Sequence, residues 1–371
     1  MSELYIGLMS GTSLDGVDAV LADFSGARPV VLGHCSAPLT PDLQIELLAL
    51  NSPTNNELHR AALAANGLAR VYAQVVQVLL QQCRVAESAV RAIGAHGQTV
   101  RHRPLEFDGT GYTLQLNQPA LLAELCGIDV VADFRSRDVA AGGQGAPLVP
   151  PFHQAFFGHP DQKRAVLNIG GISNITVLDP FAVQPVNGFD CGPGNALMDA
   201  WCLQHTGEPF DEGGGWAAQG TVHTELLSRL QDESYFAKAP PKSTGRDLFN
   251  TPWLLPKLAG LDTLPPEDVQ ATLTELTAQA CASSLLATTT GCETLIVCGG
   301  GAFNRHLMVR IQSALPACQV VSSAQFGLPP LQVEATAFAW LARQAMERKS
   351  ASVPSVTGAK GARILGAIYP A

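Results

Sequence analysis

The sequence predicts an α/β protein of two domains, in which mixed sheets are flanked by helices. Runs of Val, Ile and Leu typical of strands alternate with long helical patterns, and three of these strands break into glycines, within residues 4–24, 165–178 and 294–304. The chain has 371 residues, which is more than one hydrophobic core usually serves. We therefore expect two domains, with an active site in the interdomain cleft.

Composition narrows the class of protein. Hydrophobic residues make up 46% of the chain, yet no apolar run approaches the ~20 residues that a membrane span requires. The N-terminus begins as a strand, so we expect neither a secretory signal nor a membrane association. Nine cysteines without a CxxC pair favour reduced thiols and a cytoplasmic location. A net charge of −9 argues against a nucleic-acid partner.

The first element is a hairpin, in which the apolar runs 4–9 and 17–24 flank the polar turn 10–16. Gly11 and Gly16 allow backbone conformations in which N–H groups point at an anion, and the Thr12 and Ser13 hydroxyls add donors. No lysine and no helix follow the turn, so it is neither a Walker loop nor a dinucleotide fingerprint. On the residues alone, it is either an ordinary polar turn or a phosphate site.

The rest of the first domain alternates between strands and helices. A strand, 91–97, ends in His96-Gly97-Gln98, at the edge where α/β folds place ligand contacts. His96 by itself is either a core histidine or a ligand contact. The other predicted elements are strand 30–34, helices 42–50 and 56–83, strand 112–116, helix 119–126 and strand 128–134.

A charged cluster follows the strand 128–134. Arg135 and Arg137 stand beside a glycine-rich loop, residues 140–147. Such a cluster is usually a solvated loop with weak ion pairs. An arginine at a strand end can also bind a carboxylate with two parallel hydrogen bonds.

The middle of the chain carries the candidate acid. After a helix and polar linker (148–164) and the glycine-broken strand 165–178, residues 186–195 (VNGFDCGPGN) read as a glycine-rich loop before helix 196–204. Asn195 is its expected N-cap, and the helix N-terminus is a favourable place for negative charge. Asp190 either caps its own turn or faces a ligand there.

The last third contains a helix at 221–230, a loop at 240–246, a helix at 265–290 and the strand that ends in Gly299-Gly300-Gly301. Lys242 and Arg246 of the loop either reach phosphates or are solvated. Asn304 opens a further helix. Glu334 lies in the first turn of helix 331–348, where the dipole favours a carboxylate and a solvent-side cap is the alternative role. Strands 319–322 and 363–369 complete the chain.

The three glycine-broken strands resemble the phosphate-1, phosphate-2 and adenosine segments of the actin-like ATPase superfamily, which includes sugar kinases. Seven further strings narrow the resemblance to the anhydro-N-acetylmuramic acid kinase family, over essentially the whole chain. They are 9–18 (MSGTSLDGVD), 96–99 (HGQT), 132–135 (ADFR), 142–147 (GGQGAP), 188–195 (GFDCGPGN), 242–246 (KSTGR) and 365–370 (LGAIYP).

The resemblance implies a set of site residues. It implies Asp190 as the general base. It also implies that His96, Gln98, Arg135, Arg137 and Glu334 bind the amino sugar, with Arg137 favoured as the partner of its lactyl carboxylate. The implied ATP-binding residues are Gly11, Thr12, Ser13, Leu14, Asp15, Gly16, Val17, Asp18, Gly170, Gly171, Gly192, Gly299, Gly300, Gly301 and Asn304.

The resemblance also implies two domains, 1–135 with 335–371 and 136–334, and ATP with Mg²⁺ as cofactors. Magnesium prefers oxygen ligands and keeps most of its waters, so we expect it to be held mainly through water and the ATP phosphates. Its protein ligand is left open among Asp15, Asp18 and Asp190. A homodimer is also left open.

The expected reaction follows from the substrate. In a 1,6-anhydro sugar, oxygen 6 is tied to carbon 1, so water must open the ring before oxygen 6 can accept a phosphoryl group. One base, Asp190, would serve both steps. The predicted function is an ATP-dependent kinase that hydrolyses and phosphorylates anhydro-N-acetylmuramic acid at position 6. The alternatives are a kinase for an ordinary sugar or carboxylate, and an ATP-switched scaffold like actin.

Overall fold

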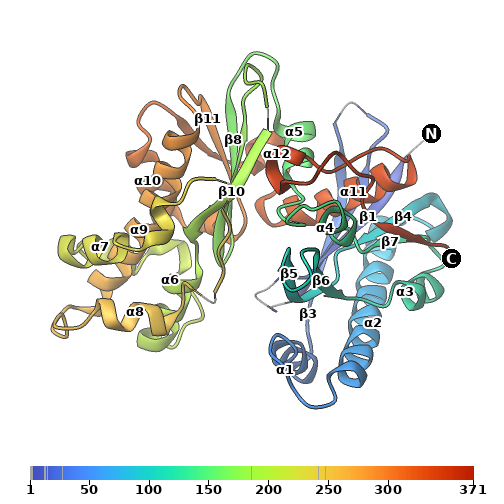
Figure 1. Cartoon of the computed structure of the whole chain (residues 1–371), viewed down its shortest axis with the longest axis horizontal. Helices are drawn as coiled ribbons and strands as arrows, with labels where there is room; N and C mark the ends of the chain where they lie inside the picture. Colours follow the sequence, from blue (N-terminus) through green and yellow to red (C-terminus); the bar gives the residue numbers. More distant parts are fainter. Residues whose placement is uncertain are drawn as a thin grey trace. The chain divides into compact units, whose positions relative to one another are not determined.

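The computed structural model describes residues 3–11, 14, 16–26, 28–184, 186–240, 242–246 and 248–371. The chain forms two compact units (Figure 1), one made of Met1–Phe156 with Gln332–Ala371 and the other of Phe157–Leu331. The boundaries predicted from the sequence, at 135 and 335, assign residues 136–156 to the other unit. As a statement about independent domains, that division stays a prediction.

The first unit is built on a six-stranded mixed sheet with the order β13-β7-β4-β1-β2-β3. The predicted hairpin is present, because β1 pairs antiparallel with β2 from Leu4↔Asp23 to Met9↔Asp18. β4 and β7 continue the sheet in parallel, and β13 closes it antiparallel to β7. The strands of this sheet are β1 (Leu4–Met9), β2 (Gly16–Asp23), β3 (Val30–Pro38), β4 (Val90–Ala95), β7 (Val130–Ala132) and β13 (Ala367–Tyr369).

Helices cover both faces of this sheet (Figure 1). Helices α2 (Glu57–Cys83) and α3 (Pro119–Cys126) share a core with one face, and α11 (Val333–Met346) packs on the other. Two strand glycines permit this close approach, since a Cβ on Gly7 would lie 1.8 Å from the Ala335 carbonyl oxygen and one on Gly94 2.1 Å from that of Phe338. The last long helix, predicted at 331–348, thus packs on the sheet of the first unit.

Helix α2 is, within the described part of the chain, the one helix long and apolar enough to span a membrane. In the best 18-residue window, 56% is buried within the structure. Its buried side chains, such as Leu68, Tyr72 and Val76, belong to the core of the first unit. Packing of its apolar face against a sheet accounts for its composition.

The second unit holds a five-stranded sheet with the order β10-β9-β8-β11-β12. β8, β9 and β10 form an antiparallel meander, and β11 and β12 add in parallel. Helix α9 (Pro266–Thr288) is buried nearly all round in its first half and organises the core. The strands are β8 (Arg164–Ile169), β9 (Ile172–Leu178), β10 (Val186–Pro193), β11 (Thr294–Cys298) and β12 (Gln319–Ser322).

The two sheets repeat one topology. In each, a three-stranded antiparallel meander is followed by two parallel strands on the side of its first strand, as β3-β2-β1-β4-β7 and as β10-β9-β8-β11-β12. The predicted α/β class, with mixed sheets flanked by helices, is confirmed. The remaining elements are α1 (Pro41–Ala49), β5 (Gln98–Pro104), β6 (Gly111–Leu116), α4 (Ser136–Ala140), α5 (Pro150–Phe157), α6 (Ala196–Thr206), α7 (Thr224–Gln231), α8 (Thr251–Lys257), α10 (Arg305–Ala314) and α12 (Pro354–Thr357).

Two sequence predictions of local structure were wrong. Residues 186–195 were predicted as a loop, but Val186–Pro193 form the edge strand β10, where glycine and a terminal proline are tolerated. Strand β5 was missed, because its sequence, QTVRHRP, is polar and it pairs only with β6.

Candidate active site

The first hairpin turn is held by hydrogen bonds at both ends. Leu14 adopts φ 61°, and its N–H donates to the Gly11 carbonyl over 3.2 Å. The side chains of Leu14 and Val17 lie in the hydrophobic core, so only their backbone can face a ligand. Asp18 accepts a hydrogen bond from His34 Nε2 at 3.1 Å. The predicted contacts from Thr12, Ser13 and Asp15 lie outside the described residues.

Residues at the junction of β4 and β5, together with Tyr72 of α2, form hydrogen bonds that fix the backbone of this turn. Gln98 Nε2 donates to the Gly11 carbonyl over 3.1 Å, and the Tyr72 hydroxyl lies 2.9 Å from Ser10 Oγ. Tyr72 also accepts from the Gly97 N–H at 3.1 Å. Gln98 Oε1 is buried and has no partner among the described residues. Gln98, predicted as a sugar contact, therefore also fixes the backbone of the turn.

His96 is neutral and its tautomer follows from its neighbours. Burial and the nearby Arg135 guanidinium lower the pKa of His96 to about 3. Arg135 Nη2 lies 2.9 Å from His96 Nε2, and His96 Nδ1 lies 3.3 Å from the Ser10 carbonyl oxygen. Because a guanidinium only donates, Nε2 accepts and Nδ1 carries the proton. The structure thus brings two predicted sugar-site residues into direct contact.

Arg135 connects this histidine to the glycine-rich loop. Its Nη1 donates to the Gly145 carbonyl over 2.8 Å, and burial lowers its pKa to about 10, so it stays charged at neutral pH. Burial raises the pKa of Glu334, which the charge of Arg135 partly offsets and that of Asp18 reinforces. Glu334 is only partly exposed, in the first turn of α11, and its carboxylate interacts electrostatically with the same cluster.

The glycine-rich loop is anchored by the buried carboxylate of Asp138, which follows Arg137 in the sequence. Asp138 accepts hydrogen bonds from the Gly145 N–H and the Thr357 hydroxyl, both at 2.8 Å. A Cβ on Gly143 would lie 2.2 Å from Asp138 Oδ2, so glycine is required there. Asp138 is therefore a structural residue.

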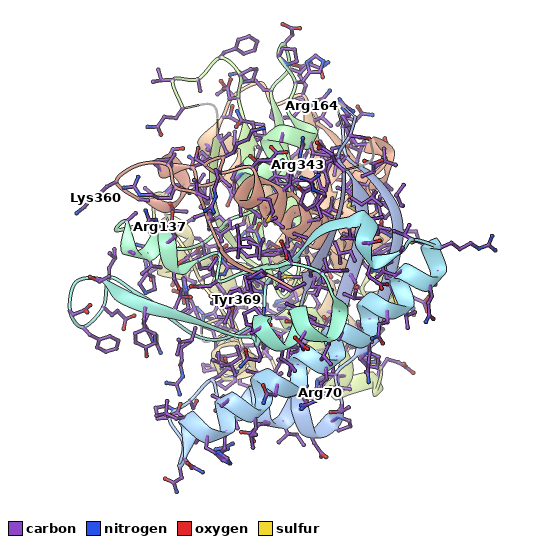
Figure 2. The ribbon with its side chains drawn as sticks, turned by 90° about the vertical axis from the view of Figure 1, so that its right-hand side faces the viewer. Arg70, Arg137, Arg164, Arg343, Lys360 and Tyr369 are labelled. Carbon is purple, nitrogen blue, oxygen red and sulfur yellow. The ribbon has the colours of Figure 1, made fainter. Side chains whose placement is uncertain are left out.

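Arg137 differs from Arg135 in being exposed. Figure 2 shows Arg137 and Lys360 at the same edge of the first unit, where the Lys360 N–H donates to the Ala141 carbonyl over 2.9 Å. Within the described residues, no hydrogen-bond or ion-pair partner engages the Arg137 guanidinium. Of the two arginines, Arg137 is thus the exposed one, with no donor engaged by another described residue.

In the second unit, Asp190 lies at a β-bulge on the edge strand β10. The strand register shifts between Asp190 and Gly192, which leaves Cys191 as the extra residue. Bulges re-aim side chains and are common next to active sites. Asp190 Oδ2 accepts a hydrogen bond from the Thr244 N–H at 3.0 Å, and no described residue donates to Oδ1. One carboxylate oxygen is thus fixed and the other is available.

The environment of Asp190 also tunes its acidity. Burial raises the pKa of its carboxyl to about 6, and the hydrogen bond from Thr244 opposes this shift. A carboxylate with a pKa near the working pH can accept a proton from water and release it again. Asp190 is therefore suited to general-base chemistry.

The N-terminus of α6, which follows Asp190 and β10, is partly engaged by the turn between β8 and β9. The N–H groups of Gly194 and Ala196 donate to the Gly171 carbonyl, at 2.9 and 3.2 Å, and that of Asn195 donates to the Gly170 carbonyl at 2.7 Å. These three N–H groups are therefore not available to an anion, and the prediction that the helix N-terminus favours negative charge rests on the donors that follow them in α6. Asn195 also makes no side-chain cap, because its Nδ2 donates to the Ile169 carbonyl over 3.2 Å.

The two cationic side chains of the 242–246 loop, Lys242 and Arg246, whose roles the sequence left open, lie in different surroundings. Lys242 turns inward, with Nζ 4.9 Å from the centre of the Tyr235 ring and 3.4 Å from the Phe236 carbonyl oxygen. Arg246 lies across the predicted phosphate-2 segment, since a Cβ on Gly171 would be 2.9 Å from its Nη2. The contacts of Tyr235 and Thr244 with Asp190 were not predicted, because they join residues 45 and 54 positions apart in the sequence.

The third glycine segment packs against the second. A Cβ on Gly299 would lie 2.6 Å from the Ile169 carbonyl oxygen, and one on Gly301 2.4 Å from Ile169 Cγ2. The predicted phosphate-2 and adenosine segments are thus neighbours at one end of β8 and β11. Asn304 Oδ1 caps α10 by accepting from the Leu307 N–H at 2.9 Å, so one end of its side chain is used structurally.

No group of three or more His, Cys, Asp or Glu side chains among the described residues could hold a metal ion. That part of the chain therefore offers no dedicated cage of protein ligands. A magnesium ion that arrives with ATP and keeps its waters needs none.

Known proteins resemble the chain over its whole length. A family model described as anhydro-N-acetylmuramic acid kinase matches residues 3–371. The anhydro-N-acetylmuramic acid kinase of Albidiferax ferrireducens is 66% identical and covers 100% of both chains. That of Variovorax paradoxus is 63% identical and covers 100% of this chain and 99% of its own.

A solved structure supports the fold. It is the activator of the 2-hydroxyisocaproyl-CoA dehydratase from Clostridium difficile with bound ADPNP, which aligns with a TM-score of 0.51 and 13% identity over 95% of this chain and 100% of that chain. At this identity the likeness concerns the fold alone. The family model and the identity to curated relatives show that the chain belongs to the anhydro-N-acetylmuramic acid kinase family.

Proposed function

We propose that the chain is an ATP-dependent kinase that opens the 1,6-anhydro ring of anhydro-N-acetylmuramic acid with water and phosphorylates oxygen 6. The products are N-acetylmuramic acid 6-phosphate and ADP, and the reaction belongs to cell-wall recycling. Family membership supports the activity. The single structural observation that supports the mechanism is the bulged Asp190, with one free carboxylate oxygen and a pKa of about 6.

Asp190 acts first on water. Its Oδ1 takes a proton from a water molecule whose oxygen attacks carbon 1, and the bond from carbon 1 to oxygen 6 breaks. Oxygen 6 leaves as an alkoxide, which attacks the γ-phosphorus of ATP, and ADP departs. The proton stays on Asp190 until the products leave. General-base assistance of this kind contributes ~10²–10⁴-fold to the rate.

The phosphates are held mainly by backbone. We assign the Gly11–Asp18 turn to them, together with Gly170, Gly171 and the triple glycine at 299–301. Arg246 extends this set, because its guanidinium lies over Gly171. Positioning and neutralisation of charge are the main contributions a protein makes to phosphoryl transfer. Mg²⁺ bound with ATP would supply part of that neutralisation.

The sugar is assigned to the polar cluster of the first unit. Arg137 is the proposed partner of the lactyl carboxylate, since its guanidinium is exposed and Arg135 is committed to His96 and Gly145. A guanidinium binds a carboxylate with two parallel, charge-assisted hydrogen bonds. His96, Gln98 and Glu334 complete the proposed sugar contacts.

The remaining proposals concern the setting of the enzyme. The family gives it a small amino-sugar substrate. We propose a cytoplasmic location, without nucleic-acid or membrane partners, and leave a homodimer open. Nine cysteines and a net charge of −9 support the first two of these proposals.

The deciding experiment measures ADP release from ATP and Mg²⁺ with the anhydro sugar, with N-acetylmuramic acid or with no sugar. We expect release only with the anhydro sugar. Water labelled with ¹⁸O should place the label on the anomeric oxygen of the product and none on its phosphate. Release that is indifferent to sugar would favour an ATP-switched scaffold, and release with N-acetylmuramic acid alone would favour an ordinary sugar kinase.

A further inference from the structure

Three contacts from one segment hold Asp190. Because β10 is the edge strand of its sheet, the outward backbone groups of Asp190 have no strand partner. The Tyr235 hydroxyl donates to the Asp190 carbonyl over 2.7 Å, and the Asp190 N–H donates to the Lys242 carbonyl over 3.2 Å. The Thr244 N–H binds the carboxylate at 3.0 Å. We call Tyr235, Lys242 and Thr244 the clasp.

Tyr235 is the one member of the clasp that acts through its side chain. It is 2% exposed, and its ring meets those of Phe249 and Phe236 edge-on, with centroid distances of 5.8 and 6.3 Å. Lys242 Nζ lies over the same ring. These contacts fix the place of the hydroxyl. Burial, reinforced by the charge of Asp190, raises the pKa of Tyr235, so its hydroxyl remains a donor wherever the enzyme works.

The β-bulge after Asp190 explains why its orientation depends on the clasp. At the bulge, the ladder between β10 and β9 is interrupted immediately after Asp190, so the sheet alone does not fix the direction of its carboxylate. The hydroxyl of Tyr235 satisfies the carbonyl that the edge leaves unpaired, and the rest of the clasp satisfies the N–H and the carboxylate. The base is therefore oriented from outside the sheet.

We propose that Tyr235 is a positioning residue for Asp190, and that its hydroxyl holds the bulged strand so that Oδ1 faces the attacking water. This proposal rests on the proposed function, because it presumes that Asp190 is the base. Misplacing a base by a fraction of an ångström lowers the rate of the chemical step and leaves substrate binding intact. Tyr235 touches neither substrate in this proposal.

The test compares Tyr235→Phe with the matched variant Tyr112→Phe, whose ring is 37% exposed in the first unit. We expect Tyr235→Phe to lower kcat about 10- to 100-fold, with the KM values for sugar and ATP within about twofold of wild type. Without the Tyr235 hydroxyl, the Asp190 carboxylate should move away from the Thr244 N–H, whose hydrogen bond lowers its pKa. The acid limb of the pH profile of kcat should therefore move to higher pH. Tyr112→Phe should match wild type throughout.

Two further variants make each outcome decisive. Phe249→Leu keeps the Tyr235 hydroxyl but removes the aromatic ring that packs against Tyr235, and should lower kcat by a smaller factor. If Tyr235→Phe does not fold, Phe249→Leu provides the test. Asp190→Asn is measured alongside. If Asp190→Asn is inactive and folded Tyr235→Phe has wild-type kcat and pH profile, the positioning role is wrong. Full activity in Asp190→Asn would instead overturn the proposed role of Asp190 as the general base, on which the role of Tyr235 depends.

Discussion

General bases need a pKa near the pH of the reaction, and a protein provides it by disfavouring the charged form. At Asp190, burial has this effect and raises the pKa to about 6. The same shift has a cost in stability, because the folded chain must hold a carboxylate that water would solvate better. Catalytic tuning and stability therefore oppose each other at this residue.

Asp190→Asn is expected to lower kcat by ~10²–10⁴-fold and to raise stability at pH 8. The folded carboxyl keeps its proton up to about pH 6, whereas the unfolded one loses it near pH 4, so wild-type stability falls as the pH rises between these values. Above them the variant should be more stable by about 1–3 kcal/mol. Urea unfolding at pH 4 and pH 8 measures this, and an equal difference at both values would contradict it.

The assignment of Arg137 leads to a second prediction at the residue scale. Arg137→Ala should raise the KM for the anhydro sugar about 10- to 100-fold, the loss expected for a charge-assisted pair. With 1,6-anhydro-N-acetylglucosamine, which lacks the lactyl carboxylate, wild type and variant should have equal kcat/KM. Arg70→Ala, on the exposed side of α2 (Figure 2), is the matched control. Equal losses with both sugars would assign Arg137 another role.

At the scale of elements, the site of the second unit depends on how closely α6 approaches the turn between β8 and β9. Gly194 allows this approach, since a Cβ there would lie 2.3 Å from the Gly170 carbonyl oxygen. The donors of the helix N-terminus then bind the carbonyls of that turn and fix its shape. The predicted phosphate-2 segment is thus held in place by the start of α6.

Gly194→Ala should therefore push α6 away from this turn. We expect a loss of stability of about 1–3 kcal/mol, as for overpacking elsewhere, and a higher KM for ATP. Gly215→Ala is the control, because Gly215 has helical φ and ψ and its Cβ would make only an ordinary contact at 3.5 Å. Chemical unfolding and ATP titration measure both effects, and wild-type behaviour of Gly194→Ala would show that the approach is not needed.

Elements with local sequence signals could be predicted, whereas elements and contacts that depend on distant residues could not. The hairpin, the long helices and the three glycine-broken strands follow from periodicity and turn residues, and the structure has them. Strand β10 was misread because its glycines and Pro193 are typical of loops, and only pairing with β9 shows that it is a strand. The contacts of Tyr235 and Thr244 with Asp190 cross 45 and 54 residues, and no local pattern reports them.

At the scale of the whole molecule, the second unit is one continuous segment, Phe157–Leu331, whereas the first is assembled from two pieces of chain. The continuous unit has its own core, which includes Leu167, Leu273 and Leu295. A unit with its own sheet and core has what it needs to fold alone.

Residues 157–331 expressed alone should therefore unfold in one cooperative transition, with the far-ultraviolet spectrum of an α/β protein. Residues 1–156 expressed alone should not, because they lack α11 and β13, which complete the first sheet and cover one face of it. Circular dichroism and thermal melting compare the two fragments. Cooperative melting of 1–156, or its absence in 157–331, would contradict the division into units.

The late position of α11 has a consequence for biosynthesis. A ribosome releases Gly7 and Gly94 early, but the helix that packs against them emerges only after the entire second unit has been made. During that interval the nascent chain carries an apolar sheet face whose covering helix has not yet been made. Translation that stops before α11 leaves this face bare, and such truncated chains become substrates for chaperones and proteases.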